Sequence, residues 1–179
     1  MLAASAAPAG AQLHLTQDEA LRLAFPEPAL IERETAFLAD EDLERARQLA
    51  GGDVKIDGRV ISYYVGRMGG ELLGVAYFDA HRVRTLPEVL MFVVTPDSRI
   101  ARIEVLRFSE PPEYRPPEKW LDQFAGLGLT QRLSLRGSIV NITGATLTAG
   151  AVTAASRRIL ALHSVINPLA VSSGSEGRR

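Results

Sequence analysis

The chain has 179 residues, 46% of them hydrophobic, which is enough to bury one ordinary core. Lys and Arg number 20 against 21 Asp and Glu, so the net charge is −1 and the chain lacks the basic surface that nucleic-acid binding requires. The absence of cysteine excludes disulfides, iron–sulfur clusters and thiolate zinc sites, and three widely spaced histidines do not predict a protein metal site. Any redox chemistry here needs an organic cofactor.

The N-terminal residues 1–11 are small and uncharged and end in Ala9-Gly10-Ala11. This ending fits the small-residue cleavage site of a secretory signal, so we expect export to a periplasmic or other extracytoplasmic location. The charged part and most of the apolar part of such a signal are missing. A disordered tail rich in Ala and Pro is the alternative interpretation.

Residues 12–58 are expected to form a helical N-terminal part. Thr16 and the glutamate three residues later fit a capping box for a first helix, which should end before Pro26. A second helix is expected through residues 30–37. A third should begin after Asp40 and end at the glycine pair that follows residue 50.

Four segments rich in Val, Ile, Tyr and Leu predict β-strands. The connector between the first two contains two glycines and indicates a hairpin, and the third segment is fully apolar, as expected of a central strand. These strands are expected at residues 60–66, 71–79, 88–95 and 100–108.

The remainder of the chain combines loops with a long C-terminal helix. Four prolines in residues 110–117 indicate an ordered loop, and the helix is expected from about Thr148 to Asn167. The order of helices, antiparallel strands and a last helix predicts an α+β fold. We also expect a short helix at residues 118–124, a strand at 131–142, a main domain over 59–168 and a disordered tail over 169–179.

The last helix is preceded by small and hydroxyl-bearing residues, Thr143-Gly144-Ala145-Thr146-Leu147-Thr148. The first turn of a helix leaves backbone N–H groups unpaired and carries partial positive charge, which favours a phosphate. Gly144 is expected to turn the chain, and the small residues let a ligand approach the backbone. Taken alone, these features fit an ordinary threonine-capped helix equally well.

This segment resembles the Ser/Thr-Gly-Ala-Thr-x-Thr motif of the FMN-binding domain family, which includes flavin-carrying subunits of Nqr- and Rnf-type respiratory complexes and free-standing exported domains. Residues 93–97 resemble the family's strand and Asp-containing turn, and residues 120–126 resemble its Trp-x-x-x-Phe-x-Gly segment. The similar segments lie within residues 70–165, whereas residues 13–60 match nothing.

The resemblance implies an electron-transfer flavoprotein rather than an enzyme. In this family a flavin transferase joins the phosphate of FMN to a threonine as a phosphoester, and the matching residue here is Thr146. The resemblance also implies a periplasmic location and electron exchange with a membrane redox complex or a cytochrome. The other motif residues implied to bind the cofactor are Thr143, Gly144, Ala145, Leu147 and Thr148.

The sequence departs from the family pattern at two places. The family usually has Asp three residues before the first motif hydroxyl, where this chain has Val140. Residues 110–114 replace the Glu-Thr-Pro-Gly loop of the respiratory members, which indicates a divergent, free-standing branch. Two alternatives therefore stay open: an enzyme-like or sensory module that holds FMN without a covalent bond, and an exported scaffold that has lost its flavin.

Side chains outside the motif give weaker signals. His81 is expected in a surface loop after a strand, with contact to the flavin or to a partner as the alternative. Glu110 and Glu113 are expected in a solvated loop rich in proline. Aromatic residues are common in strands, so stacking on a flavin ring is not specifically indicated for Tyr63, Tyr64 or Tyr77.

Overall fold

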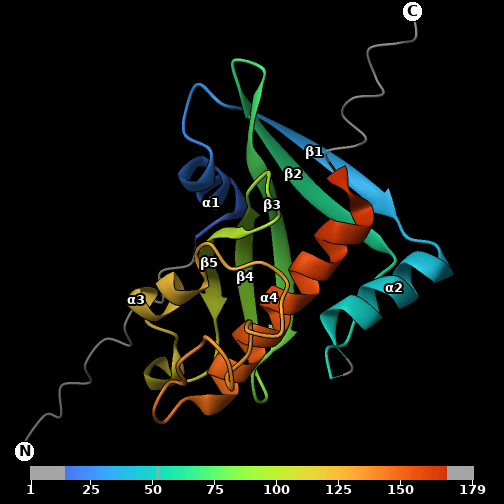
Figure 1. Ribbon diagram of the computed structural model, residues 1–179. Helices are drawn as coiled ribbons and strands as arrows, with labels where there is room; N and C mark the ends of the chain where they lie inside the picture. Colours follow the sequence, from blue (N-terminus) through green and yellow to red (C-terminus); the bar gives the residue numbers. More distant parts are fainter. Residues whose placement is uncertain (1–14, 52, 169–179) are drawn as a thin grey trace, which may run out of the picture.

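The computed structural model describes residues 15–51 and 53–168 and has the expected α+β fold (Figure 1). Five strands form one antiparallel sheet in which each strand pairs with the next along the chain. The strands are β1 (Leu30–Phe37), β2 (Val60–Met68), β3 (Glu71–Arg82), β4 (Pro87–Val94) and β5 (Ile100–Phe108). The helices are α1 (Gln17–Ala24), α2 (Asp40–Ala50), α3 (Glu118–Leu121) and α4 (Thr146–Ile166), with 3-10 turns η1 (Pro112–Tyr114) and η2 (Asp122–Phe124).

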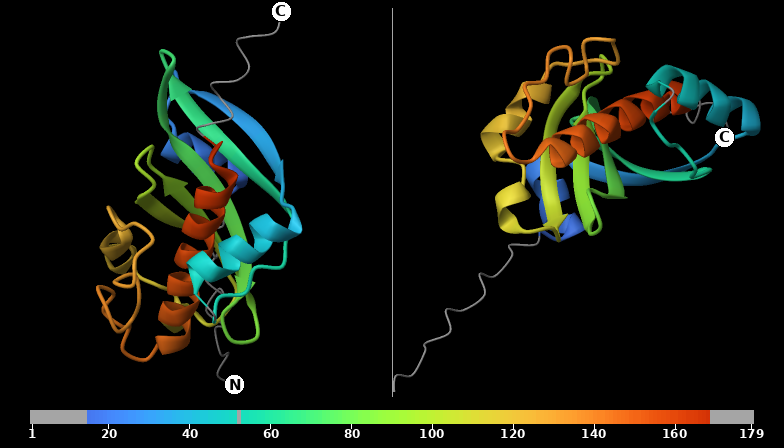
Figure 2. Two further views of the ribbon diagram at one scale, coloured as in Figure 1. Left: turned by 45° about the vertical axis from the view of Figure 1, so that its right-hand side comes forward. Right: turned by 90° about the horizontal axis from the view of Figure 1, so that it is seen from below.

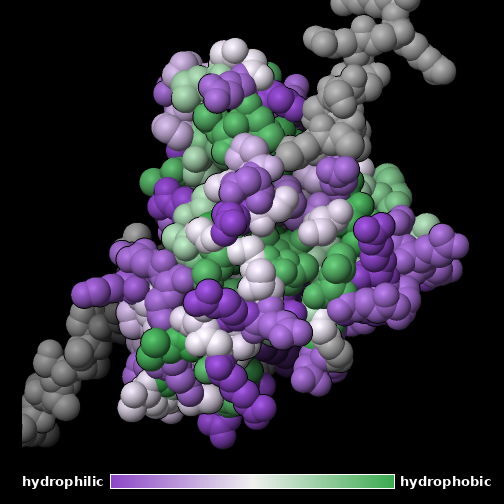
Figure 3. Space-filling model, in the orientation of Figure 1, coloured by the Kyte–Doolittle hydropathy of each residue, from purple (hydrophilic) through white to green (hydrophobic). Residues whose placement is uncertain are grey.

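The long helix α4 crosses one face of the sheet, where its apolar side forms the main core (Figures 1 and 2). Tyr77 and Phe92 from the sheet share this buried cluster with Val152 and Ile159 from α4. The helix ends at Asn167, whose left-handed backbone (φ 46°, ψ 58°) is typical of a C-terminal cap. In the space-filling view from this side, apolar side chains gather in the middle of the face and polar ones surround them (Figure 3).

Helix α1 covers the opposite face of the sheet (Figure 2). Leu21 and Phe25 are buried there in one cluster with Met91 and Val93. Gly66 in β2 is required by this packing, because a Cβ at that position would lie 2.4 Å from the Phe25 ring. Strands β1 and β5 form the two edges of the sheet; β1 is mostly exposed, whereas most side chains of β5 are buried.

Several predicted elements are confirmed. Thr16 caps α1: its Oγ1 accepts the Glu19 N–H at 3.3 Å and its own N–H donates to Glu19 Oε2 at 2.8 Å, so the capping box is present. Strand β5 has the predicted bounds. Strands β2 and β3 form the predicted hairpin, with a shorter connector, Gly69 and Gly70, than the four residues expected.

The helix predicted through residues 30–37 is wrong, because this segment is strand β1. It pairs with β2 from Leu30 opposite Arg67 to Phe37 opposite Val60. As an edge strand it buries little on either face, so its sequence lacks the alternation of apolar and polar residues that marks a half-buried strand.

The strand predicted at residues 131–142 is also wrong. Local hydrogen bonds form a series of turns there, including Ser138 N–H to Arg132 O at 2.7 Å and Gly137 N–H to Ser134 O at 2.9 Å. Helix α4 begins at Thr146, slightly before the predicted start at about Thr148.

Two predictions lie outside the described residues: the signal-like segment at residues 1–11 and the disordered tail at 169–179. Within residues 15–51 and 53–168, no helix has the length and apolar character needed to cross a membrane.

Candidate functional site

The candidate site is a cavity of about 270 Å³ at the N-terminus of α4. The β3–β4 loop and the proline-rich segment before α3 complete its walls. Five of the six motif residues line it, and Thr143 does not. The full set of lining residues is Val83, Arg84, Glu110, Tyr114, Gly144, Ala145, Thr146, Leu147 and Thr148.

The start of α4 has no side-chain cap. Ala145 is the N-cap residue, and its methyl group accepts no hydrogen bond. Within the described part of the chain, the N–H groups of Thr146, Leu147 and Thr148 have no acceptor, and the helix ladder begins with Ala149 N–H to Ala145 O at 3.1 Å. An uncapped helix start presents these donors and partial positive charge to an anion.

Gly144 turns the chain into this helix, as predicted. Its φ of 82° lies in the left-handed region that glycine adopts without strain. No atom lies within 4 Å of the position of an added Cβ. The backbone conformation, and not crowding, therefore favours glycine at this position.

The three motif threonines differ in accessibility. Thr146 is exposed, and its Oγ1 accepts a hydrogen bond from Asn141 Nδ2 at 3.1 Å. Thr148 is only 1% exposed and donates its hydroxyl to Tyr114 O at 2.8 Å. Thr143 is exposed but lies outside the cavity lining. Of the motif hydroxyls, only that of Thr146 is both at the cavity and exposed to solvent.

Glu110 holds the β3–β4 loop against the cavity. Its Oε1 accepts the backbone N–H groups of Arg84, Thr85 and Leu86 at 3.2, 2.7 and 2.8 Å. The hydrogen bonds from Leu86 and Thr85 keep the pKa of Glu110 below its ordinary value. The predicted solvated position is wrong for Glu110, which is buried because these donors replace water, whereas Glu113 is exposed.

Arg84 lines the cavity from the same loop and brings a cation to it. The Arg84 side chain is exposed, while its backbone is fixed by Glu110. No sequence pattern marks Arg84, because its position at the cavity depends on the hairpin pairing of β3 and β4.

The segment before the motif is held by the helix that contains Trp120. Trp120 Nε1–H donates to Val140 O at 2.6 Å, and Val140 N–H donates to Gln123 Oε1 at 2.9 Å. The Val140 side chain itself is 70% exposed. The backbone of Val140 therefore links residues 120–123 to the segment that leads into residues 143–148.

A charged cluster lies between α4 and the sheet. Arg158 binds Asp79 in a bidentate manner, with Nε to Oδ2 at 2.7 Å and Nη2 to Oδ1 at 2.9 Å. His81 bridges Asp79 Oδ1 at 2.7 Å and Glu88 Oε2 at 3.0 Å. The surface-loop prediction is wrong for His81, because β3 continues to Arg82 and places His81 opposite Glu88.

The environment of this cluster shifts the pKa values of Asp79, His81 and Glu88 in different directions. Burial disfavours the charged forms, but hydrogen bonds from Arg158 and His81 lower the pKa of Asp79 to about 2. Burial also opposes the charge on His81, yet its hydrogen bonds to Asp79 and Glu88 raise its pKa to about 9. Burial raises the pKa of Glu88, whose Oε1 has no hydrogen-bond partner within the described residues.

The strand tyrosines do not line the cavity. Tyr77 is buried in the core, where its Oη lies 2.9 Å from His163 Nδ1, and Tyr63 packs beside it. Tyr64 faces the other side of the sheet against Phe78. Burial lowers the pKa of His163 to about 4. The aromatic residue at the cavity is instead Tyr114 from the proline-rich segment.

The chain matches no model of a known protein family and none of the curated proteins with which it was compared.

Proposed function

We propose that this chain is an electron-transfer flavoprotein that carries one FMN at the start of α4, joined through its phosphate to Thr146 Oγ1. The observation that carries this proposal is the arrangement of the motif: residues 144–148 line one cavity, and Thr146 is exposed there. Thr148 is a poor attachment site because its hydroxyl is buried and already donates to Tyr114 O.

The groups around the cavity suit a flavin phosphate. The N–H groups of Thr146, Leu147 and Thr148 are available as donors, and Arg84 adds a positive charge. Charge of the right sign at a helix end contributes about 0.3–1 kcal/mol at an exposed site and more when partly buried. These donors and Arg84 would therefore stabilise a phosphate bound here.

The size of the cavity supports a carrier function. Its volume of about 270 Å³ lies just below the range of cavities that enclose small ligands, about 300 to 1,000 Å³. The cavity would therefore enclose part of an FMN and leave the rest at the protein surface. An exposed cofactor can exchange electrons with a second protein, whereas substrate chemistry generally requires an enclosed site.

The bound cofactor would supply reversible electron transfer, and the protein would supply its position and electrostatic environment. Thr146 would fix the phosphate at α4, and Arg84 would balance its charge. Glu110 would keep the β3–β4 loop in place beside it through its three backbone hydrogen bonds.

The proposed partners are a flavin transferase and a membrane redox complex or cytochrome, with the protein working outside the cytoplasm. These parts of the proposal rest on the resemblance of residues 143–148 to the FMN-binding domain family. Fractionation of the cells that produce the protein tests the location, and recovery of the native chain from the cytosol would contradict it.

Mass measurement after co-expression with a flavin transferase tests the attachment. The intact chain should gain the mass of one FMN less one water, and Thr146→Ala should lose this gain. Thr143→Ala is the matched control, because Thr143 is an exposed motif threonine outside the cavity, and it should retain the gain. Flavin on Thr146→Ala would show that the attachment site is elsewhere.

The colour of the denatured protein separates the alternatives. A chain that stays yellow after unfolding holds its flavin covalently. A chain that bleaches on unfolding holds FMN without a covalent bond, which would favour an enzyme-like or sensory module. A colourless chain would favour a scaffold that has lost its flavin.

A further inference from the structure

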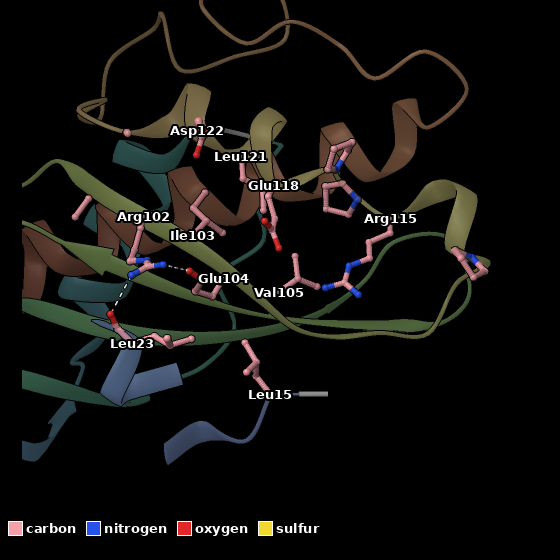
Figure 4. Close-up of a pocket in the computed structure, with 15 residues that line it drawn as sticks. Leu15, Leu23, Arg102, Ile103, Glu104, Val105, Arg115, Glu118, Leu121 and Asp122 are labelled. Atoms are coloured by element: carbon pink, nitrogen blue, oxygen red, sulfur yellow. Dashed lines mark hydrogen bonds and ion pairs between the residues drawn. The ribbon is translucent and has the colours of Figure 1, made fainter. Parts of the chain in front are cut away.

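A second hollow, distinct from the motif cavity, runs along the edge strand β5 (Figure 4). Its volume is about 790 Å³. Five consecutive β5 residues, 101–105, form its floor. Leu15 and the α1 residue Leu23 form one side, and the proline-rich segment with α3 forms the other. We call this hollow the β5 groove; its lining includes Leu15, Leu23, Pro112, Pro116, Pro117 and Leu121.

Strand β5 pairs with β4 on one side, and its other edge faces this groove. On the side away from β4, Ile100 exchanges hydrogen bonds with Leu127 and Gly126, at 2.9 and 2.8 Å. Within the described chain, no further backbone hydrogen bond joins residues 101–107 to a segment on that side. Alternate N–H and C=O groups of this stretch are therefore free to pair with an added strand.

The walls of the groove limit what can reach this edge. The proline-rich segment and α3 stand beside β5 on one side, and α1 lies on the other (Figure 4). A single extended polypeptide fits such a hollow. In a second copy, the β5 edge is flanked by the same two walls. Pairing of β5 with β5 between two copies would therefore make these walls clash.

The charges in the groove define the partner further. Arg102 is already engaged by Glu104 and by Leu23 O. Glu118 and Asp122, one helical turn apart on the α3 wall, are both exposed and form no ion pair within the described residues. Arg115 is also exposed on this wall and brings one positive charge, so two carboxylates against one guanidinium leave the wall with a net negative charge.

We propose that the β5 groove binds an extended segment of a partner polypeptide, which pairs with β5 as a further strand and places a basic side chain against Glu118 and Asp122. Backbone pairing gives such complexes their affinity, and the side-chain pockets give their specificity. The proposal does not depend on whether the chain carries a flavin.

Peptide titration of the isotopically labelled full chain, followed by amide signals and amide hydrogen exchange, tests the proposal. The probe is the capped peptide Thr-Val-Lys-Val-Lys-Val-Thr at up to millimolar concentration. It should shift the signals of residues 101–107 and slow their exchange. The same peptide with N-methyl groups on alternate residues should bind at least tenfold more weakly, because its pairing edge is blocked.

Charge reversal tests the acidic wall. The double variant Glu118→Lys with Asp122→Lys should weaken binding of the lysine peptide by about fivefold, the upper end for exposed ion pairs. It should strengthen binding of the same peptide with Glu in place of Lys. Glu41→Lys, a matched change at an exposed residue of α2 outside the groove, should leave both affinities unchanged.

Three results would each overturn the proposal. One is unchanged signals for residues 101–107 at millimolar peptide. Another is equal binding of the N-methylated peptide. The third is a concentration-dependent shift of the same residues without peptide, which would assign the β5 edge to pairing between copies of this chain.

Discussion

The ion pair between Arg158 and Asp79 joins the motif helix α4 to the centre of the sheet, and its removal is the sharpest test of how this helix is held. Both hydrogen bonds of the bidentate pair are short, at 2.7 and 2.9 Å, and the two side chains are 17% and 9% exposed. We expect Arg158→Met to leave the Asp79 carboxylate buried with His81 as its remaining charged partner. The methionine preserves most of the packing volume, so the measured loss reports mainly on the polar contacts of Arg158, which also donates from Nη1 to Lys55 O at 3.1 Å.

The size of the loss follows from this burial. Removing one member of a buried ion pair costs about 3–5 kcal/mol, because the other charge is left without compensation. Asp79 keeps its 2.7 Å hydrogen bond to His81, which places our expectation at the lower end, about 3 kcal/mol. The double variant Arg158→Met with Asp79→Asn should recover part of this loss, since no unpaired carboxylate remains.

Urea unfolding at neutral pH measures these free energies directly. The matched control is Arg59→Met, which removes an arginine from an exposed ion pair with Asp40 and should cost no more than about 1 kcal/mol. A loss for Arg158→Met equal to that of Arg59→Met would refute the reasoning, because the buried pair would then contribute no more than an exposed one.

Further predictions concern pH and the motif. The pKa of His81 in the folded chain, about 9, lies above its unfolded value of 6.5. The contribution of His81 to stability is therefore full below pH 6.5 and is lost as the pH rises towards 9. In urea unfolding, His81→Gln should flatten this decline. The folded pKa of His163, about 4, lies below 6.5, so stability should also decline as the pH falls from 6.5 towards 4, and a flat acidic profile would contradict this. Val140→Asp should raise the flavin-modified fraction under limiting transferase. It should not destabilise the fold, because the side chain at this position is 70% exposed. An unchanged fraction would show that the transferase recognises other residues. Gly144→Val should block flavin attachment while the circular dichroism spectrum stays unchanged. It should lower the free energy of unfolding by about 1–2 kcal/mol, because valine is strained at the positive φ of this position. Normal flavin attachment to this variant would show that the turn is not needed.

The sequence predicted the elements whose stability depends on local signals. The capping box at Thr16, the apolar segment of β4 and the helical spacing of α4 each encode their structure within a few residues. Strand β1 could not be predicted in this way, because its conformation is imposed by pairing with β2 and most of its side chains face solvent. The start of α4 was placed slightly late for a related reason: Ala145 offers no capping side chain that would mark it.

At the candidate site, the sequence identified the motif but not its surroundings. Residues 144–148 were expected to form a turn and a helix start beside a cleft, and the turn, the helix start and a cavity lined by them are all present. Glu110, Arg84 and Tyr114 also line the cavity, yet each comes from a segment far from the motif in the chain. Their approach depends on the hairpin between β3 and β4 and on the path of the proline-rich segment, which no local pattern encodes.

The way Glu110 holds the β3–β4 loop has a consequence for how this protein can diverge. Glu110 recognises only the main-chain N–H groups of residues 84–86, and the side chains of these residues are exposed. Related chains can therefore exchange the side chains at these positions, and so alter the charge presented beside the cavity, while the loop keeps its path. The one class of change that this arrangement excludes is proline at residues 85 or 86, where the loss of an N–H would remove one of the two shortest bonds to the carboxylate.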